Sequence, residues 1–547
     1  MRLFMLLLVI LSFSCAQTPE FDTVIRNGTL YDGTGQTPVV GDLAIKNDRI
    51  VAIGKFDGKG KTEVDATGKA VSPGFINMLS WANISLLHDG RSQSDLRQGV
   101  TLEVMGEGRS MGPLNANMKQ DMQSNQEAIK FEVGWNTLGE YLSHLEKKGV
   151  STNVTSFVGN GTLRTYVMGF ESRKPTAEEL EQMKNLLEDE MKAGAVGISS
   201  SLLYAPSMHA DTDELVELAK VAAKYDGMYI SHIRDEGDLL VESVEELIQI
   251  SRQAGIRAEV YHLKASSASN WHKMDTVINR IQAARAEGLP VTADMYTYNA
   301  SSTGLHVTLP QWVRADGVEA MLAKLTDAAV RKKAIEGIQW RTPPGGILFV
   351  GFRNPELRKY LGKRLDFVAQ EMNLSAEEAL VELLLQDQSR VQVVYFSMSE
   401  ENIDKKIQLP WMSFCSDAGS YSAEGVFLEQ STHPRAYGSF ARVLGLYSRD
   451  KKLFPLQEAV RKLSGLPAEN LKLKDRGLLK ENFFADVVVF DAERIQDHAT
   501  FEQPHQYATG VEQVFVNGVQ VLKDGEHTGA MPGRFVKGPG AVQKKKL

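Results

Sequence analysis

The sequence predicts an α/β fold whose parallel strands close into a barrel. Three short apolar runs, at 229–237, 259–267 and 291–299, each end in polar residues, and helical stretches at 238–253 and 273–287 separate them. An apolar run of strand length, then a helix, then another apolar run is typical of βα units and a parallel sheet. In a closed parallel barrel the carboxyl ends of all strands point into one mouth, so residues distant in sequence converge there.

Chemically active side chains stand where these runs end. His232 and His262 close the first two runs, and Asp294 lies in the third. A single histidine at a strand end is more often an ordinary hydrogen-bonded polar residue. Two histidines on consecutive strand ends favour a shared metal ion instead, because neutral imidazole is a common zinc ligand.

The alternation of strands and helices extends over most of the chain. Residues 307–350 are rich in Leu, Ala, Lys and Arg and break the rhythm, so we expect an inserted helical segment that caps one end. Further helices are expected at 176–193 and 211–225. Further strands are expected at 71–77, 99–108, 153–161, 195–206, 390–398 and 409–420, the last two being the final strands of the barrel.

Strand-like segments with turn signals occupy both ends of the chain, at 24–54 and 485–529. Turns such as Asn27-Gly28 between alternating apolar residues indicate antiparallel β structure. We therefore expect one small β domain, a β-sandwich assembled from both ends. The predicted organisation is a signal at 1–15, the amino-terminal segment of the β-sandwich at 22–70, the barrel at 71–475 and the carboxy-terminal segment of the β-sandwich at 476–540.

Composition narrows the functional class. Apolar residues make up 43% and charged residues 24% of the chain, which is ordinary for a globular protein. The net charge of −8 argues against non-specific binding of nucleic acid. No internal stretch approaches the apolar length of a membrane span.

The first fifteen residues predict export. Arg2 precedes a short apolar core that is typical of a secretory signal, and the core runs into Ser14-Cys15-Ala16, which resembles the lipobox of bacterial lipoproteins. The expected location is periplasmic or lipid-anchored to a bacterial membrane, with membrane contact only through a lipid at Cys15. A plain cleaved signal with an incidental Cys15 is the alternative. Cys415 would be the remaining cysteine, so no internal disulfide is expected.

Two further residues fit a hydrolytic site at the same mouth. Asp417 follows an apolar run, where a carboxylate can take a proton from a water activated by a metal. Arg435 lies in a loop expected above the mouth, and its guanidinium suits a bidentate grip on a carboxylate. Taken alone, an aspartate in a turn is usually a capping residue, and the arginine could equally form a loop ion pair.

Together these motifs resemble the N-acyl-D-amino-acid deacylases, or D-aminoacylases, of the amidohydrolase superfamily. The resemblance covers nearly everything after the signal and includes the motifs VSPGFI at 71–76, SHIRDEG at 231–237, YHLKAS at 261–266, CSDAG at 415–419 and HPRAYGSFARVL at 433–444. It implies a (β/α)8 TIM barrel with a small β-sandwich domain built from both chain ends. It also implies that His232 and His262 bind zinc and that Asp417 is the catalytic aspartate. Contacts with the carboxylate of the substrate are implied for Lys264, Tyr296, Ser302 and Arg435.

The sequence departs from the family where a second metal would bind. Leu79 and Trp81 occupy the two histidine positions of the HxH motif, and neither can coordinate zinc. The cysteine that normally completes the tight site aligns with Gly108. The adjacent Glu107 is therefore the predicted third ligand, whereas Glu103 is the weaker candidate and is expected to be a buried polar group inside the barrel.

The resulting hypothesis is a metal-dependent hydrolase that cleaves the amide bond of an N-acyl or peptidyl amino acid, with N-acyl-D-amino acids among the candidates. It predicts one zinc ion per chain, held by Glu107, His232 and His262, and a small acylated amino acid or dipeptide as substrate. One alternative is a secreted non-catalytic barrel, which is a pseudoenzyme or binding protein. Another is an amidohydrolase that acts on a cyclic amide or a lactone.

Overall fold

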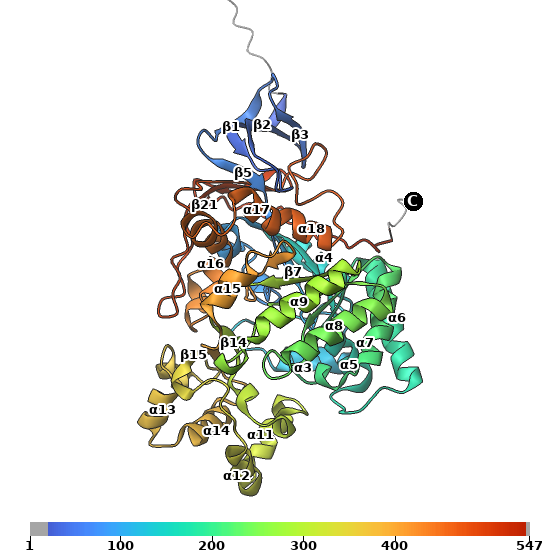
Figure 1. Ribbon diagram of the computed structural model, residues 1–547, viewed down its shortest axis with the longest axis vertical. Coiled ribbons are helices and arrows are strands. Elements are labelled where there is room, and N and C mark those ends of the chain that lie inside the picture. Colours follow the sequence, from blue (N-terminus) through green and yellow to red (C-terminus); the bar gives the residue numbers. More distant parts are fainter. Residues whose placement is uncertain (1–19, 543–547) are drawn as a thin grey trace, which may run out of the picture.

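The computed structural model describes residues 20–542, which form a barrel with a β domain at one end and an inserted unit at the other (Figure 1). The expected signal at 1–15 and the lipid site at Cys15 lie outside the described residues. Within the described part of the chain, no helix combines the length and the apolar character needed to cross a membrane.

Parallel strands form the barrel in the order β6-β7-β8 and β9-β10-β11-β12-β13-β17. Their bounds are β6 Phe75–Asn77, β7 Val100–Met105, β8 Asn153–Ser156, β9 Val158–Gly159, β10 Gly197–Ser201, β11 Met228–His232, β12 Arg257–Val260, β13 Val291–Met295 and β17 Met412–Phe414. β8 and β9 share one position interrupted at Phe157, so residues 20–542 supply eight strand positions. The Met78 amide donates to the Phe414 carbonyl at 3.2 Å and brings β6 beside β17. The predicted closed barrel is confirmed.

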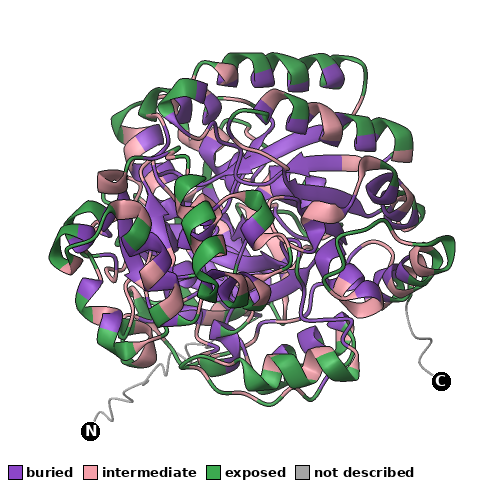
Figure 2. Ribbon diagram, turned by 90° about the horizontal axis from the view of Figure 1, so that it is seen from below, coloured by how far each residue is buried: buried purple, intermediate pink, exposed green. Residues whose placement is uncertain are grey.

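Helices cover the outside of this barrel and turn their apolar faces inward (Figure 2). Thr176 caps α6 in a capping box with Glu179, which satisfies amide groups at the helix start. The principal helices are α4 Leu138–Lys148, α5 Asn160–Met168, α6 Ala177–Ala193, α7 Thr212–Lys224, α8 Leu240–Ala254, α9 Lys273–Ala286, α15 Glu400–Lys406 and α16 Arg435–Arg442. Shorter or peripheral ones are α1 Ser85–His88, α2 Gln93–Leu96, α3 Ala116–Ser124, α17 Leu456–Val460 and α18 Leu466–Asn470. The four helices predicted from hydrophobic periodicity are confirmed to within a few residues.

The two chain ends build one β domain. Its sheet has the order β21-β20-β19-β18-β5-β1-β2-β3, with β4 paired to β1. The antiparallel pair β5–β18 joins the two ends, with Val71 opposite Val489. The strands are β1 Phe21–Leu30, β2 Val39–Lys46, β3 Arg49–Gly54, β4 Gly60–Asp65, β5 Ala70–Pro73, β18 Val487–Phe490, β19 Val511–Val516, β20 Val519–Lys523 and β21 Glu526–His527. The predicted β domain from both ends is confirmed.

The inserted unit is longer than the expected segment at 307–350. Its sheet, in the order β14-β16-β15, is antiparallel and comprises β14 Ser301–Gly304, β15 Ile347–Gly351 and β16 Gln392–Tyr395. Its helices are α10 Gln311–Arg314, α11 Val318–Thr326, α12 Ala328–Glu336, α13 Leu365–Met372 and α14 Ala376–Asp387, and they pack with the sheet into a core of their own. The prediction that 390–398 forms a barrel strand is therefore wrong. An apolar strand looks the same in sequence whether a barrel or a small sheet buries it.

A cluster of apolar side chains lies in the barrel interior, as expected for this fold. Ile76, Leu102, Val104, Met228 and Ile230 belong to this interior cluster. Because the interior is packed, the polar residues at the carboxyl ends of the strands lie together at the open end of the barrel.

Candidate functional site

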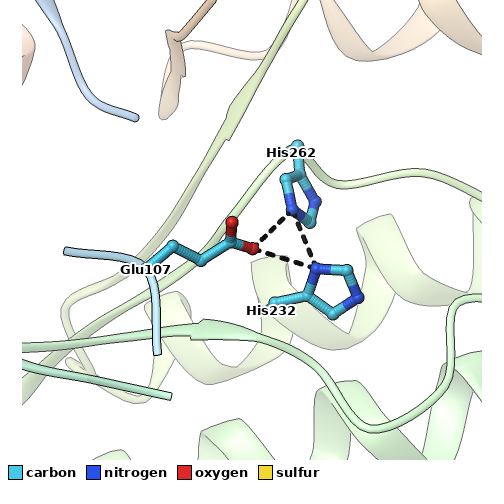
Figure 3. Close-up of side chains that lie close together, drawn as sticks. All are labelled: Glu107, His232 and His262. Carbon is cyan, nitrogen blue, oxygen red and sulfur yellow. Dashed lines mark hydrogen bonds and ion pairs between the residues drawn. The ribbon is translucent and has the colours of Figure 1, made fainter. Parts of the chain in front are cut away.

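Three buried side chains meet at the carboxyl end of the barrel. Glu107 follows β7, His232 is the last residue of β11, and His262 follows β12. Glu107 Oε1 lies 3.0 Å from both His232 Nδ1 and His262 Nε2, and the two nitrogens are 3.0 Å apart. Figure 3 shows the carboxylate and the two imidazoles pointing at one another. The three residues predicted as ligands are thus brought together in one group.

The pKa shifts of Glu107 and His262 indicate which charge this group of side chains binds. Burial alone would raise the pKa of Glu107, but hydrogen bonds with His232 and His262 lower it well below its usual range. Burial opposes a charge on His262, yet the carboxylates around it raise the pKa of that imidazole to about 10. Both shifts mean that the three donor atoms together favour a bound positive charge. Nitrogen and carboxylate donors at this separation fit a single metal cation, because zinc accepts such ligands at about 2.0–2.2 Å.

Neighbouring strands hold His262 in place. Its backbone has a φ of +35°, and its amide donates to Asp294 Oδ1 at 2.7 Å. Asp294, which ends the third run, therefore supports the backbone of His262. Burial raises the pKa of Asp294 to about 6.

Glu236 is a site residue that the sequence analysis missed. Glu236 Oε1 lies 3.1 Å from His262 Nδ1 and accepts from Lys264 Nζ at 2.5 Å. A carboxylate on the second nitrogen of a metal-binding imidazole fixes its tautomer and its orientation. The signal was present in SHIRDEG, where a glutamate follows the strand-end histidine by four residues. Lys264, which is predicted to hold the substrate, has its charge matched by Glu236, and its Nζ also lies 2.6 Å from His262 Nδ1.

Asp417 and Arg435 form a buried ion pair on the other side of the mouth. Arg435 Nη1 lies 2.7 Å from Asp417 Oδ2, and the guanidinium stacks 4.5 Å from the ring centre of Tyr296. Asp417 Oδ1 accepts from Trp81 Nε1 at 3.1 Å. The prediction that Arg435 lies in a loop is wrong, since it is the first residue of α16. Arg435 Nε has no hydrogen-bond partner among residues 20–542, so this cation keeps a donor available.

The remaining two predicted residues differ in their placement. Tyr296 is buried beneath Arg435, and its hydroxyl lies 3.4 Å from Met398 Sδ. Ser302 belongs to β14 and donates to the Val393 carbonyl at 2.9 Å, inside the sheet of the inserted unit.

The inserted unit approaches the histidines through other side chains. Thr303, which follows Ser302, has its hydroxyl 2.7 Å from that of Tyr204. The Tyr204 ring lies 5.3 Å from the ring of His232. Tyr204 therefore connects the inserted unit with His232, and this contact could not be predicted from the sequence around Thr303 or Tyr204 alone.

Glu103 does not face the barrel interior. Leu102 and Val104 point inward, so Glu103 between them points outward, where Ser80 and Thr152 each donate to it at 2.7 Å. The expectation that Glu103 lies inside the barrel is wrong. Strand alternation determines which residues share a face, but it does not tell which face is the interior.

A closed parallel barrel with two histidines, a glutamate and an aspartate at its carboxyl end has the architecture of a metal-dependent barrel hydrolase. Residues 431–522 match the Amidohydrolase family. The chain is 34% identical over 528 residues to a D-aminoacylase from Alcaligenes xylosoxydans xylosoxydans, in a match that covers 96% of this chain and 99% of that relative. It therefore belongs to the D-aminoacylase, or N-acyl-D-amino-acid deacylase, family of amidohydrolases.

Solved structures agree with this assignment. A D-aminoacylase with a binuclear metal centre superimposes with a TM-score of 0.79 at 31% identity, covering 94% of this chain and 99% of that one. An N-acyl-D-glutamate deacylase from Bordetella bronchiseptica, complexed with zinc and a phosphonate inhibitor, does so with a TM-score of 0.79 at 29% identity and the same coverage. The predicted family, fold class and enzyme class, a hydrolase of non-peptide carbon–nitrogen bonds, are confirmed.

Proposed function

We propose that this chain is a one-zinc deacylase that hydrolyses N-acyl-D-amino acids. The observation that carries the proposal is the group of Glu107, His232 and His262, with donor atoms 3.0 Å apart. The relatives supply the substrate class, since they are a D-aminoacylase and deacylases of N-acyl-D-glutamate and N-acyl-D-aspartate.

We infer one zinc ion rather than two because Leu79 and Trp81 occupy the two HxH positions. Leu79 is an apolar residue of the barrel interior, and the indole of Trp81 donates its only polar hydrogen to Asp417. Neither side chain offers a lone pair to a metal. A zinc ion held by Glu107, His232 and His262 would polarise the scissile carbonyl and acidify a water.

Asp417 is the proposed general base and acid. Its carboxylate is buried at the mouth, between Trp81 and Arg435, and its negative charge helps to raise the pKa of His262. It would take the proton of the attacking water and return it to the leaving amine.

Arg435 is the proposed grip on the substrate carboxylate. It is a buried cation with a free Nε donor, and a planar guanidinium matches a carboxylate with two parallel hydrogen bonds. Lys264 contributes less to this grip, because Glu236 already matches its charge. The face of Tyr296 beneath Arg435 restricts the directions from which a substrate carboxylate can approach.

Two measurements test this function. Elemental analysis of the purified protein should find about one zinc per chain. A panel of N-acyl-D-amino acids, N-acyl-L-amino acids, dipeptides and cyclic amides should show the highest kcat/KM among the N-acyl-D-amino acids. A protein without bound metal and without turnover would be a non-catalytic barrel, and preferred turnover of a cyclic amide would assign a different substrate.

We further propose that the protein is exported and that Cys15 becomes a lipidated amino terminus. The support is the short apolar segment that ends at Ser14-Cys15. Mass spectrometry of the native protein should find diacylglycerol on Cys15. Cleavage beyond Cys15 would refute the anchor and leave simple secretion.

A further inference from the structure

Trp81 contacts the proposed catalytic carboxylate directly. Its indole Nε1 donates to Asp417 Oδ1 at 3.1 Å, while Arg435 Nη1 pairs with Asp417 Oδ2 at 2.7 Å. The two carboxylate oxygens are thus held by different partners. Trp81 comes from the segment after β6, and Arg435 comes from the start of α16.

The backbone of Asp417 is also held from the same side. Its amide donates to the Leu79 carbonyl at 3.0 Å, and its φ is +49°. A positive φ is uncommon for a residue other than glycine, so the surrounding contacts keep this conformation. The segment 79–81 therefore holds Asp417 at two points: the Leu79 carbonyl binds its backbone amide, and the Trp81 indole binds its side-chain carboxylate.

The two side-chain partners have different tasks once a substrate binds. Arg435 would turn some of its donors to the substrate carboxylate, and this weakens its hold on Asp417 Oδ2. Trp81 is neutral and has a single donor, so a substrate carboxylate attracts it far less than it attracts the charged, two-pronged guanidinium of Arg435. The indole bond is consequently the one that persists while the base acts.

We propose that Trp81 is a positioning residue that keeps the Asp417 carboxylate directed at the reacting water when Arg435 engages the substrate. This inference rests on the proposed function, because it needs Asp417 as the base.

The test compares Trp81→Phe with the wild type. Phenylalanine keeps an aromatic ring and removes the donor, so kcat should fall about tenfold to a hundredfold, as for loss of a hydrogen bond to a charged group. KM for an N-acyl-D-amino acid and the zinc content should stay close to those of the wild type.

A control variant separates this role from general loss of an aromatic residue. Trp312 lies in α10 of the inserted unit and is 40% exposed, against 41% for Trp81. Trp312→Phe should leave kcat unchanged. Wild-type kcat in Trp81→Phe, or loss of its zinc, overturns the inference.

A second measurement does not depend on turnover. The Tm values of Trp81→Phe, Asp417→Asn and the double variant form a cycle, in which bonded residues give non-additive shifts. Additive shifts would overturn the bond between Trp81 and Asp417. A wild type that binds zinc but turns over no N-acyl amino acid would refute the proposed function instead, and the cycle would still decide the contact.

Discussion

The two sides of the barrel mouth differ in the residues that come after their strands. Glu107 and His262 follow β7 and β12, and His232 ends β11; the donor atoms of the three residues point at one another. After β6 and β17 come Leu79, Trp81 and Asp417, which pack and hydrogen-bond among themselves.

The two sides of the mouth use separate residues, so mutations can change each side without altering the other. On the first side, the Glu107 carboxylate reaches His232 and His262, whereas the adjacent Gly108 has no side chain. On the second side, the Trp81 indole donates a hydrogen bond to Asp417 and has no lone pair to offer a metal. In the proposed function, the first side would bind the zinc ion and the second side would provide Asp417 as the general base.

The largest effect is expected on the metal side. Glu107→Gln removes the charge that offsets a dication next to two imidazoles, so the variant should lose most of its zinc and its activity. Glu103→Gln is the matched control, because Glu103 is equally buried but faces away from the interior, and it should keep its zinc. Elemental analysis of both proteins decides the point, and full zinc in Glu107→Gln would exclude it as a ligand.

On the other side, Asp417→Asn should lower kcat by about a hundredfold to ten-thousandfold, the range for removal of a general base. Zinc content should not change. Asp497→Asn is a suitable control, since Asp497 pairs with Arg442 at 3.1 Å as Asp417 pairs with Arg435. If Asp417→Asn loses zinc along with kcat, Asp417 acts as a ligand and the division between the two sides fails.

A smaller effect should come from the support of the metal side. Glu236→Gln weakens the acceptor for His262 Nδ1, so zinc affinity should fall about tenfold to a hundredfold, as for other carboxylates behind a ligating histidine. Competition with a chelator measures this affinity directly. The change also leaves Lys264 without its counter-charge. Unaltered affinity would mean that Glu236 serves only Lys264.

The smallest expected effect concerns the grip on the substrate. Arg435→Lys replaces a planar fork by a point charge, so kcat/KM on an N-acyl-D-amino acid should fall about tenfold or more. Arg442→Lys, at the other end of α16, provides the comparison: Arg442 also pairs with an aspartate and lies 4.8 Å from the ring centre of Tyr298. Equal losses in both variants would show that α16 was disturbed as a whole.

Residues that follow their own strand directly were predictable. His232 and His262 stand at the ends of apolar runs, and a parallel barrel brings all such ends together, so their meeting needed no structure. Glu107 was predicted from the family resemblance, because the family's cysteine position aligns with Gly108 and Glu107 is the adjacent residue with a side chain able to bind a metal. Glu236 and Trp81 were not assigned a role, because each acts through another side chain rather than through its place on a strand.

The alternation of apolar runs and helices predicted the closed barrel, the β domain from both chain ends, most helices and the meeting of His232 and His262, and the family resemblance added Glu107. The tertiary structure alone decided that 390–398 belongs to the inserted sheet, that Glu103 faces outward and that Trp81 binds Asp417. Hydrophobic periodicity in the sequence indicates which residues of a strand or helix are buried and which of them share a face. Which partner buries that face is set by contacts between segments distant in the chain: Trp81 and Asp417 are separated by 336 positions.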